Sequence, residues 1–269
     1  MIQVWDSNVG KPVEVFRLNE SPVFQHTLNT QFSLVAAAKA GDHVQLLDLR
    51  TGSQSHVLRS GHTGYVSTVA WSRANSSILA SGGSDGKVVL WDVRKARSYI
   101  QYLDFNKVKA RKKYKSSDLS GYSHKGQVQG LIWTPLDRCL ISIGQDRIRK
   151  WDPILGTNRK TNFAPVEIQP IQLVNLQVSS GENEYLFVPE KSNVAMLDIS
   201  SGRCVKYLTG HYRNVKCLVY NQQHVELYTG GKDKKIHIWS PETENLHVEN
   251  NEQLQNLQSD TWSDSDEEF

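Results

Sequence analysis

The sequence is poor in cysteine and in long apolar runs. Its three cysteines, Cys139, Cys204 and Cys217, form no Cys-x-x-Cys pair, so neither a disulfide framework nor a zinc site is expected. A reducing compartment is expected instead. No apolar run approaches the roughly 18 residues of a transmembrane helix. The first five residues predict a strand and not a signal peptide.

Motifs of large enzyme classes are missing as well. The chain contains neither the Gly-x-x-x-x-Gly-Lys phosphate loop nor the His-Glu-x-x-His zinc motif. We therefore expect a protein that is not an enzyme and that needs no cofactor and no metal.

Six hydrophobic runs end at a Trp-Asp pair or at a close relative of one. The endings are Trp5-Asp6, Leu47-Asp48, Trp91-Asp92, Trp151-Asp152, Leu197-Asp198 and Trp239-Ser240. The gaps between them are 42, 44, 60, 46 and 42 residues. A period in the low forties that closes on Trp-Asp is typical of WD40 β-propellers, which have four strands per blade. We predict this all-β fold, which usually serves as a platform for partner proteins.

Three repeats contain a second pattern of a His, a hydroxyl, an Asp and a Trp. The sets are His62, Ser81, Asp85 and Trp91; His124, Ser142, Asp146 and Trp151; and His211, Thr229, Asp233 and Trp239. We predict a buried network in which the Asp accepts from the His, and the hydroxyl links the His to the indole. A Ser, a His and an Asp could also indicate a hydrolase. However, a catalytic triad is needed once, and this set recurs three times.

The first repeat is degenerate. His26 stands where the loop histidine would fall, and the strands predicted after it cover 31–37 and 44–49. Five repeats and a two-strand stub at 2–6 and 12–18 fall short of a closed ring, because the last repeat ends on its third strand at 235–239. Propellers close by pairing the two ends of the chain. We therefore expect an incomplete propeller and a fragment of a longer protein, with terminal strands that lie near each other but do not pair.

The charge is divided between a body and a tail. Residues 241–269 contain nine acidic side chains and no Lys or Arg, whereas 1–240 contain 31 basic and 19 acidic residues, a net charge of +12. The tail is too polar to pack and is predicted to be disordered. The basic body is compatible with acidic partners such as nucleic acid. The tail is equally compatible with a plain solubilising role.

The 60-residue gap contains an insertion at about 106–123. Its basic residues are Lys107, Lys109, Arg111, Lys112, Lys113 and Lys115. A cluster of this density is typical of a nuclear-localisation signal or a nucleic-acid patch, and also of a solvated loop. We expect a nuclear protein without a membrane partner.

Several segments carry a closer resemblance. Residues 88–96 read VVLWDVRKA and 260–268 read DTWSDSDEE, and the further matches are QLLDLRTGS at 45–53 and LTGHY at 208–212. Together they resemble the Cockayne syndrome A family of WD-repeat proteins, over essentially the whole chain. The tail is the most specific part of the match, because nothing in a propeller fold requires it.

The resemblance implies a substrate receptor of a cullin-RING ubiquitin ligase in transcription-coupled nucleotide excision repair. Its implied partners are the damaged-DNA-binding protein adaptor, transcription-coupled repair factors and stalled RNA polymerase II. In that family a Trp-Asp-x-Arg box docks on the adaptor, and here the box is Trp91, Asp92 and Arg94 around Val93. Arg94 would offer a planar fork of donors to carboxylates or carbonyls. Proteins of that family have seven blades and an N-terminal helical segment. The helical segment has no counterpart in this sequence.

The tail also suggests regulation. Ser263 and Ser265 each precede an acidic residue by three positions, which makes them candidate phosphosites. Trp262 among carboxylates suggests docking on a basic groove of a repair partner. The alternative to the receptor is a nucleic-acid-binding or general protein-interaction WD40 scaffold in the nucleus.

Overall fold

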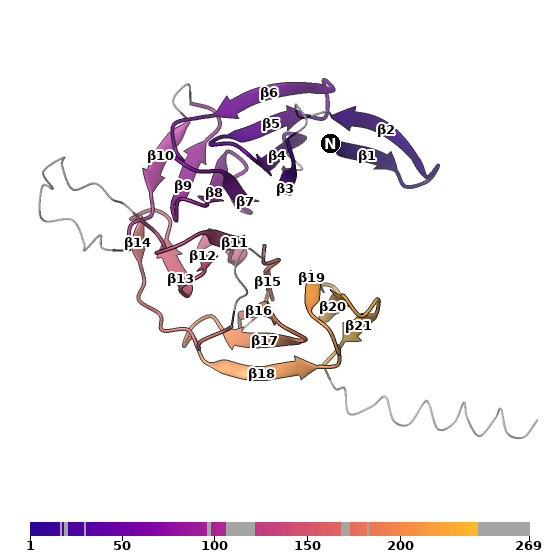
Figure 1. Ribbon diagram of the computed structural model, residues 1–269, viewed down its shortest axis with the longest axis vertical. Coiled ribbons are helices and arrows are strands. Elements are labelled where there is room, and N and C mark those ends of the chain that lie inside the picture. The colour runs from indigo at the N-terminus through magenta and orange to yellow at the C-terminus, as the bar shows by residue number, and fades with distance from the viewer. Residues whose placement is uncertain are drawn as a thin grey trace, which may run out of the picture.

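The computed structural model describes residues 1–241 except 17, 19–20, 30, 96–97, 106–121, 168–172 and 182. Within these residues, 21 strands form six antiparallel sheets around a common centre (Figure 1). The predicted all-β WD40 propeller of incomplete closure is confirmed. The described part of the chain contains no helix with the length and apolar character needed to cross a membrane.

Four sheets have four strands each, and their first strands lie nearest the centre (Figure 1). Blade 1 consists of β3 (Val23–Asn29), β4 (Leu34–Lys39), β5 (Val44–Asp48) and β6 (Ser53–Leu58). Blade 2 consists of β7 (Val66–Trp71), β8 (Ile78–Gly83), β9 (Val88–Asp92) and β10 (Tyr99–Tyr102). Blade 3 consists of β11 (Val128–Trp133), β12 (Leu140–Gly144), β13 (Ile148–Asp152) and β14 (Thr157–Asn158). Blade 4 consists of β15 (Gln177–Val178), β16 (Tyr185–Glu190), β17 (Asn193–Asp198) and β18 (Cys204–Thr209).

Two smaller sheets lie at the ends of this arc. The N-terminal sheet consists of β1 (Ile2–Asp6) and β2 (Lys11–Phe16), and the C-terminal sheet consists of β19 (Val215–Asn221), β20 (Glu226–Gly231) and β21 (Ile236–Trp239). They lie on either side of an opening in the ring and do not pair with each other (Figure 1).

The prediction for the start of blade 1 is wrong. His26 does not lie in a loop but within β3, where it pairs with Ala37 of β4. The predicted strand at 31–37 instead covers a turn and the first four residues of β4. β3 alternates between half-buried and exposed residues and carries Gln and His, so its sequence lacks a continuous apolar run. Strands β14 and β15 give no signal in the sequence, because two residues are too few to show a strand period.

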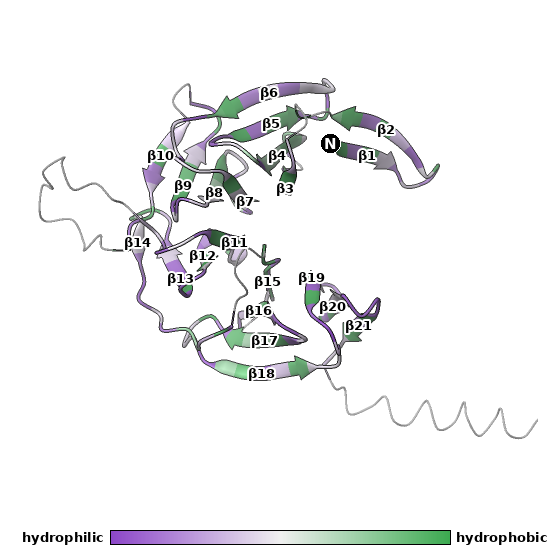
Figure 2. Ribbon diagram, viewed as in Figure 1, coloured by the Kyte–Doolittle hydropathy of each residue, from purple (hydrophilic) through white to green (hydrophobic). Residues whose placement is uncertain are grey.

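The hydrophobic core lies between neighbouring sheets. Five clusters of buried side chains fill the five junctions along the arc. Between blades 2 and 3, for example, Val88, Leu90 and Leu103 pack with Val128 and Trp133. The outer strands β6 and β10 mix hydrophobic and hydrophilic residues (Figure 2). Each blade is therefore held mainly by its two neighbours, as in other repeat folds.

The end sheets have a neighbour on one side only, and their other faces are apolar and exposed. Val13 is 66% exposed in β2, and Ile236 and Ile238 are 77% and 60% exposed in β21.

Strand β21 is expected to exchange its amide hydrogens faster than β9 and β13. In the described part of the chain β21 pairs with β20 alone, whereas β9 and β13 each lie between two strands. The outward N–H groups of β21 therefore have no ladder partner there. Hydrogen-exchange mass spectrometry on peptides from the three strands measures the difference. Equal protection of all three would contradict this expectation.

Candidate functional site

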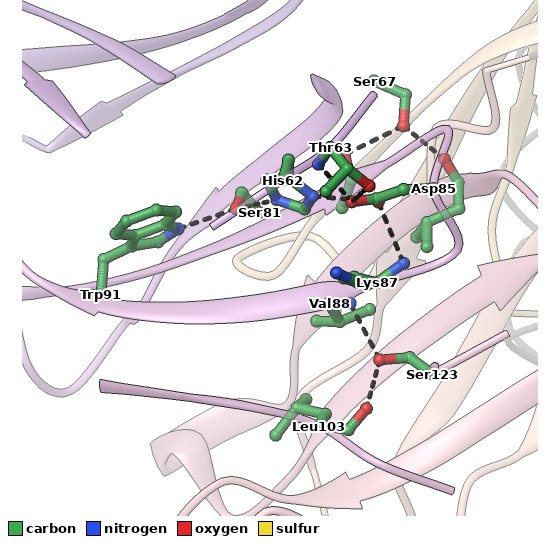
Figure 3. Close-up of polar contacts among 12 residues, drawn as sticks. His62, Thr63, Ser67, Ser81, Asp85, Lys87, Val88, Trp91, Leu103 and Ser123 are labelled. Atoms are coloured by element: carbon green, nitrogen blue, oxygen red, sulfur yellow. Dashed lines mark hydrogen bonds and ion pairs between the residues drawn. The ribbon is translucent and has the colours of Figure 1, made fainter. Parts of the chain in front are cut away.

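A buried chain of hydrogen bonds runs through blade 2 (Figure 3). The Nδ1 atom of His62 lies 3.1 Å from Asp85 Oδ1, and its Nε2 atom lies 2.8 Å from Ser81 Oγ. The Trp91 indole donates to the same Oγ at 2.7 Å. Since Nδ1–H donates to the carboxylate, a neutral ring accepts the Ser81 hydroxyl proton at Nε2. Every member is satisfied, which fixes the relative positions of four chain segments.

Blade 3 and the C-terminal sheet repeat this chain with the same atoms. The corresponding residues are His124, Ser142, Asp146 and Trp151 in blade 3, and His211, Thr229, Asp233 and Trp239 in the C-terminal sheet. The distance from His Nδ1 to the carboxylate is 2.7 Å in blade 3 and 2.8 Å in the C-terminal sheet. The structure thus brings together all three sets that the sequence pattern assigned to the network.

A glycine makes room for each histidine ring. A Cβ atom on Gly83 would lie 2.5 Å from Asp85 Oδ1 and 2.6 Å from His62 Nδ1. A Cβ atom on Gly231 would likewise lie too close to Asp233 Oδ1 and His211 Nδ1. Only Gly86 has the left-handed φ, of 74°, in the turn of blade 2. The signal available in the sequence was the recurring Gly-x-Asp.

The network hydroxyls cannot act as nucleophiles. Ser81 and Ser142 are fully buried, Thr229 is 1% exposed, and each accepts an indole N–H. Residues 82–86 also read Gly-Gly-Ser-Asp-Gly, which matches the Gly-x-Ser-x-Gly of α/β-hydrolases and was overlooked in the sequence. That motif requires a turn from strand to helix, whereas these residues join the antiparallel strands β8 and β9.

The residue opposite the network hydroxyl differs among the three sheets. It is Val89 in blade 2, Arg149 in blade 3 and His237 in the C-terminal sheet.

The ligand-type atoms of His211, Asp233 and His237 lie within 4.8 Å of one another and could hold a metal ion. Both ring nitrogens of His211 already bond within the network, so metal binding would disrupt it.

Arg149 changes the electrostatics of blade 3. Its Nη1 atom lies 2.7 Å from Asp146 Oδ2 and 2.7 Å from His124 Nδ1. Burial holds the pKa of His124 below its usual value, and the guanidinium charge also opposes protonation of the ring. Burial tends to raise the pKa of Asp146, but the hydrogen bonds and charges of His124 and Arg149 outweigh it and hold that pKa well below its usual range.

A second recurring feature lies at the end of each sheet opposite the network aspartate. There the aspartate that ends a Trp-Asp or Leu-Asp pair closes a turn. Its Oδ1 atom accepts from the backbone N–H two residues further on, at 2.8 to 3.1 Å. These residues are Asp6, Asp48, Asp92, Asp152 and Asp198. Such Asx turns hold the residues that follow in a fixed direction.

The predicted docking box combines two buried residues with an exposed one. Trp91 and Asp92 are 1% and 3% exposed, whereas the side chain of Arg94 is 63% exposed. Its Nε and Nη2 atoms donate to Asp92 Oδ1 and Oδ2 at 3.0 and 2.9 Å. This bidentate pair uses two of the five guanidinium N–H groups and leaves three that a partner could bind. Of the three residues of the box, Arg94 is the one exposed enough for a partner to reach.

The other predicted site residues lie outside the described residues. They are the basic cluster at 106–115 and, in the tail, Trp262 and the candidate phosphosites Ser263 and Ser265.

Comparisons with known proteins agree with the fold. A family model for the WD domain, G-beta repeat, matches residues 52–92 and 202–240. The WD repeat-containing protein ATCSA-1 of Arabidopsis thaliana is 29% identical, over 89% of this chain and 67% of that protein. The target of rapamycin complex subunit wat1 of Schizosaccharomyces pombe is 26% identical, over 92% of this chain and 74% of that protein. The histone-binding protein MSI1 of Saccharomyces cerevisiae is 34% identical, over 56% of this chain and 35% of that protein. WD40 repeat proteins mediate protein–protein interactions.

Replacing Asp85 with Ala is expected to destabilise the fold by about 1–3 kcal/mol, because the buried His62 Nδ1–H and two backbone N–H groups lose their acceptor. Chemical denaturation measures this cost. A matched control is Asp42→Ala, which removes an Asp–His pair whose carboxylate side chain is 66% exposed. The control should cost under about 0.5 kcal/mol. Equal effects of the two variants would show that the network does not stabilise the blade.

Acid is expected to destabilise the protein in two steps. The pKa of His124 is lower in the folded than in the unfolded chain, so unfolding takes up a proton and stability falls as pH drops below about 6.5. The depressed pKa of Asp146 adds a second loss below about pH 4. Denaturant titrations across this range give the free energy of unfolding. In a His124→Gln variant the first step should be smaller, and an unchanged slope would contradict the assignment.

Proposed function

We propose that this chain is a non-enzymatic substrate receptor of a cullin-RING E3 ubiquitin ligase that acts in transcription-coupled nucleotide excision repair. The observation that carries the proposal is the Trp-Asp-x-Arg box at the end of β9. There a buried Trp and a buried Asp hold one arginine at the surface. The adaptor that this arginine would bind is the damaged-DNA-binding protein subunit.

The geometry suits a docking contact. The network anchors Trp91, and the Asp92 turn sets the direction of Arg94 before any partner arrives. Preorganisation of this kind lowers the entropy lost on binding. The neighbouring Asp48 and Arg50 have the same spacing at the end of β5, with a longer contact of 3.5 Å.

The similarity to the WD repeat-containing protein ATCSA-1 extends over 89% of this chain and supports a WD-repeat binding platform. The repair setting itself is taken from the resemblance to the Cockayne syndrome A family. The names of the other two relatives, a subunit of a complex and a histone-binding protein, support a binding platform more generally. In the proposed role the protein is nuclear. It recruits repair factors at stalled RNA polymerase II and brings the ligase to its substrate.

A second candidate is direct nucleic-acid binding, which is favoured by the net charge of +12 on residues 1–240. Affinity for bare DNA that falls steeply with salt concentration would support it. A receptor that reaches DNA only through its partner proteins would bind bare DNA weakly and without sequence preference.

Replacing Arg94 with Ala is expected to leave folding intact and to weaken adaptor binding by about tenfold or more, because hydrogen bonds to charged groups contribute about 1.5–3 kcal/mol. Co-purification with the adaptor and a thermal melt give the two measurements. The matched control is Arg159→Ala, which removes a 43% exposed arginine paired with Asp152 in blade 3. If the Arg94 variant binds the adaptor as well as the control does, the box is not the docking element.

A further inference from the structure

A groove of about 920 Å³ lies between blades 3 and 4. One wall comes from β13 and the turn before it, and the other from 160–166 and the turn before β18. The two segments of the second wall are joined where Ala164 N–H donates to the Gly202 carbonyl at 2.8 Å. Gly202 has a left-handed φ of 78°, and a Cβ there would lie 2.5 Å from the Asn162 carbonyl oxygen. A glycine is therefore needed to bring these two segments of the second wall this close.

The groove is strongly basic. Lys125, Arg147, Lys160 and Arg203 line it from four separate segments, and all four are exposed. None of their side chains forms an ion pair with a carboxylate of the described residues. The one carboxylate in the lining, Asp146, is already paired with Arg149. The lining therefore carries four uncompensated positive charges, which attract an anionic ligand.

Apolar side chains share the lining with these charges. Phe105, Phe163, Pro165 and Val166 all face the groove. The Phe105 ring also lies 5.3 Å from the Arg149 guanidinium, a cation–π contact that keeps the ring at the wall. A ligand that offers only carboxylates would leave the apolar part of the lining without an apolar partner. A ligand that combines carboxylates with an aromatic group therefore fits the groove better.

We propose that this basic groove binds an acidic peptide with an aromatic side chain, and that residues 260–269 of the same chain are its occupant. Five of these ten residues are Asp or Glu, and the segment also carries Trp262 and Phe269. It has no basic residue that the four cations would repel.

The connection is long enough for this contact within one chain. Residues 241 to 260 are 19 positions apart, which spans up to roughly 65 Å when extended. The radius of gyration expected for about 240 folded residues is only about 18 Å. A tether of this kind gives an effective concentration of about 1 mM. A peptide with a dissociation constant of about 0.3 mM would therefore occupy the groove about three-quarters of the time.

Occupancy would make the groove a regulated surface. An acidic partner has to displace the tail, and phosphate on Ser263 or Ser265 would add about 1.5–2 negative charges to each site and hold the tail more firmly.

Cys204 provides a direct readout, because it lines the groove, whereas the exposed Cys217 lies on β19 outside it. The experiment compares alkylation rates of the two thiols in the full chain by mass spectrometry. The test variant neutralises four tail carboxylates, D264N/D266N/E267Q/E268Q. Cys204 labelling is expected to rise. For a dissociation constant of about 0.3 mM the rise is about fourfold, because the groove changes from one-quarter free to fully free. Cys217 labelling should not change.

The matched control neutralises four other carboxylates of the same tail, E242Q/E244Q/E249Q/E252Q. It should leave Cys204 labelling near that of the parent chain. A photo-crosslinking residue at Trp262 should attach to the groove walls. Equal Cys204 labelling in the parent and test chains would overturn the proposal. So would crosslinks to the separate apolar cavity of about 680 Å³ lined by Phe187, Tyr207 and Trp239.

Discussion

The rest of the structure depends on the buried hydrogen-bond chain from aspartate to indole. In blade 2 it joins the segment before β7, the strand β8, the turn before β9 and the end of β9 itself. Trp91 is thereby fixed at one end of the blade while Asp85 is fixed at the other. The exposed Arg94 follows directly from this anchored end, and its direction is set by the buried Asp92. The surface chemistry of the blade is thus built on a core that is polar but fully satisfied.

The same network tolerates variation at one position. Val89, Arg149 and His237 occupy the place opposite the hydroxyl, and each gives its sheet a different electrostatic character. In blade 3 the arginine neutralises Asp146 beside the groove, which leaves the remaining cations there unopposed. A propeller can therefore keep one structural solution in several blades and still present a different surface at each.

Much of the fold could be predicted from the sequence, because the network requires fixed residue types at fixed spacing. Strands β9, β13 and β17 end at Asp92, Asp152 and Asp198 as predicted. The three networks also form as expected. The inner strand β3 was missed because it is half exposed and mixed in polarity. The basic groove could not be seen at all. Its cations come from positions 125, 147, 160 and 203, and only the packing of two blades brings them together.

The position of the hydrophobic core between the sheets affects how the protein unfolds. Each blade contacts mainly its neighbours, so the free energy of the fold resembles a sum of terms along a line. The end sheets contribute one junction each, and inner blades contribute two. Opening of such an array starts as fraying at the ends and moves inward. The middle of the arc, where blades 2 and 3 meet, would be the last part to melt.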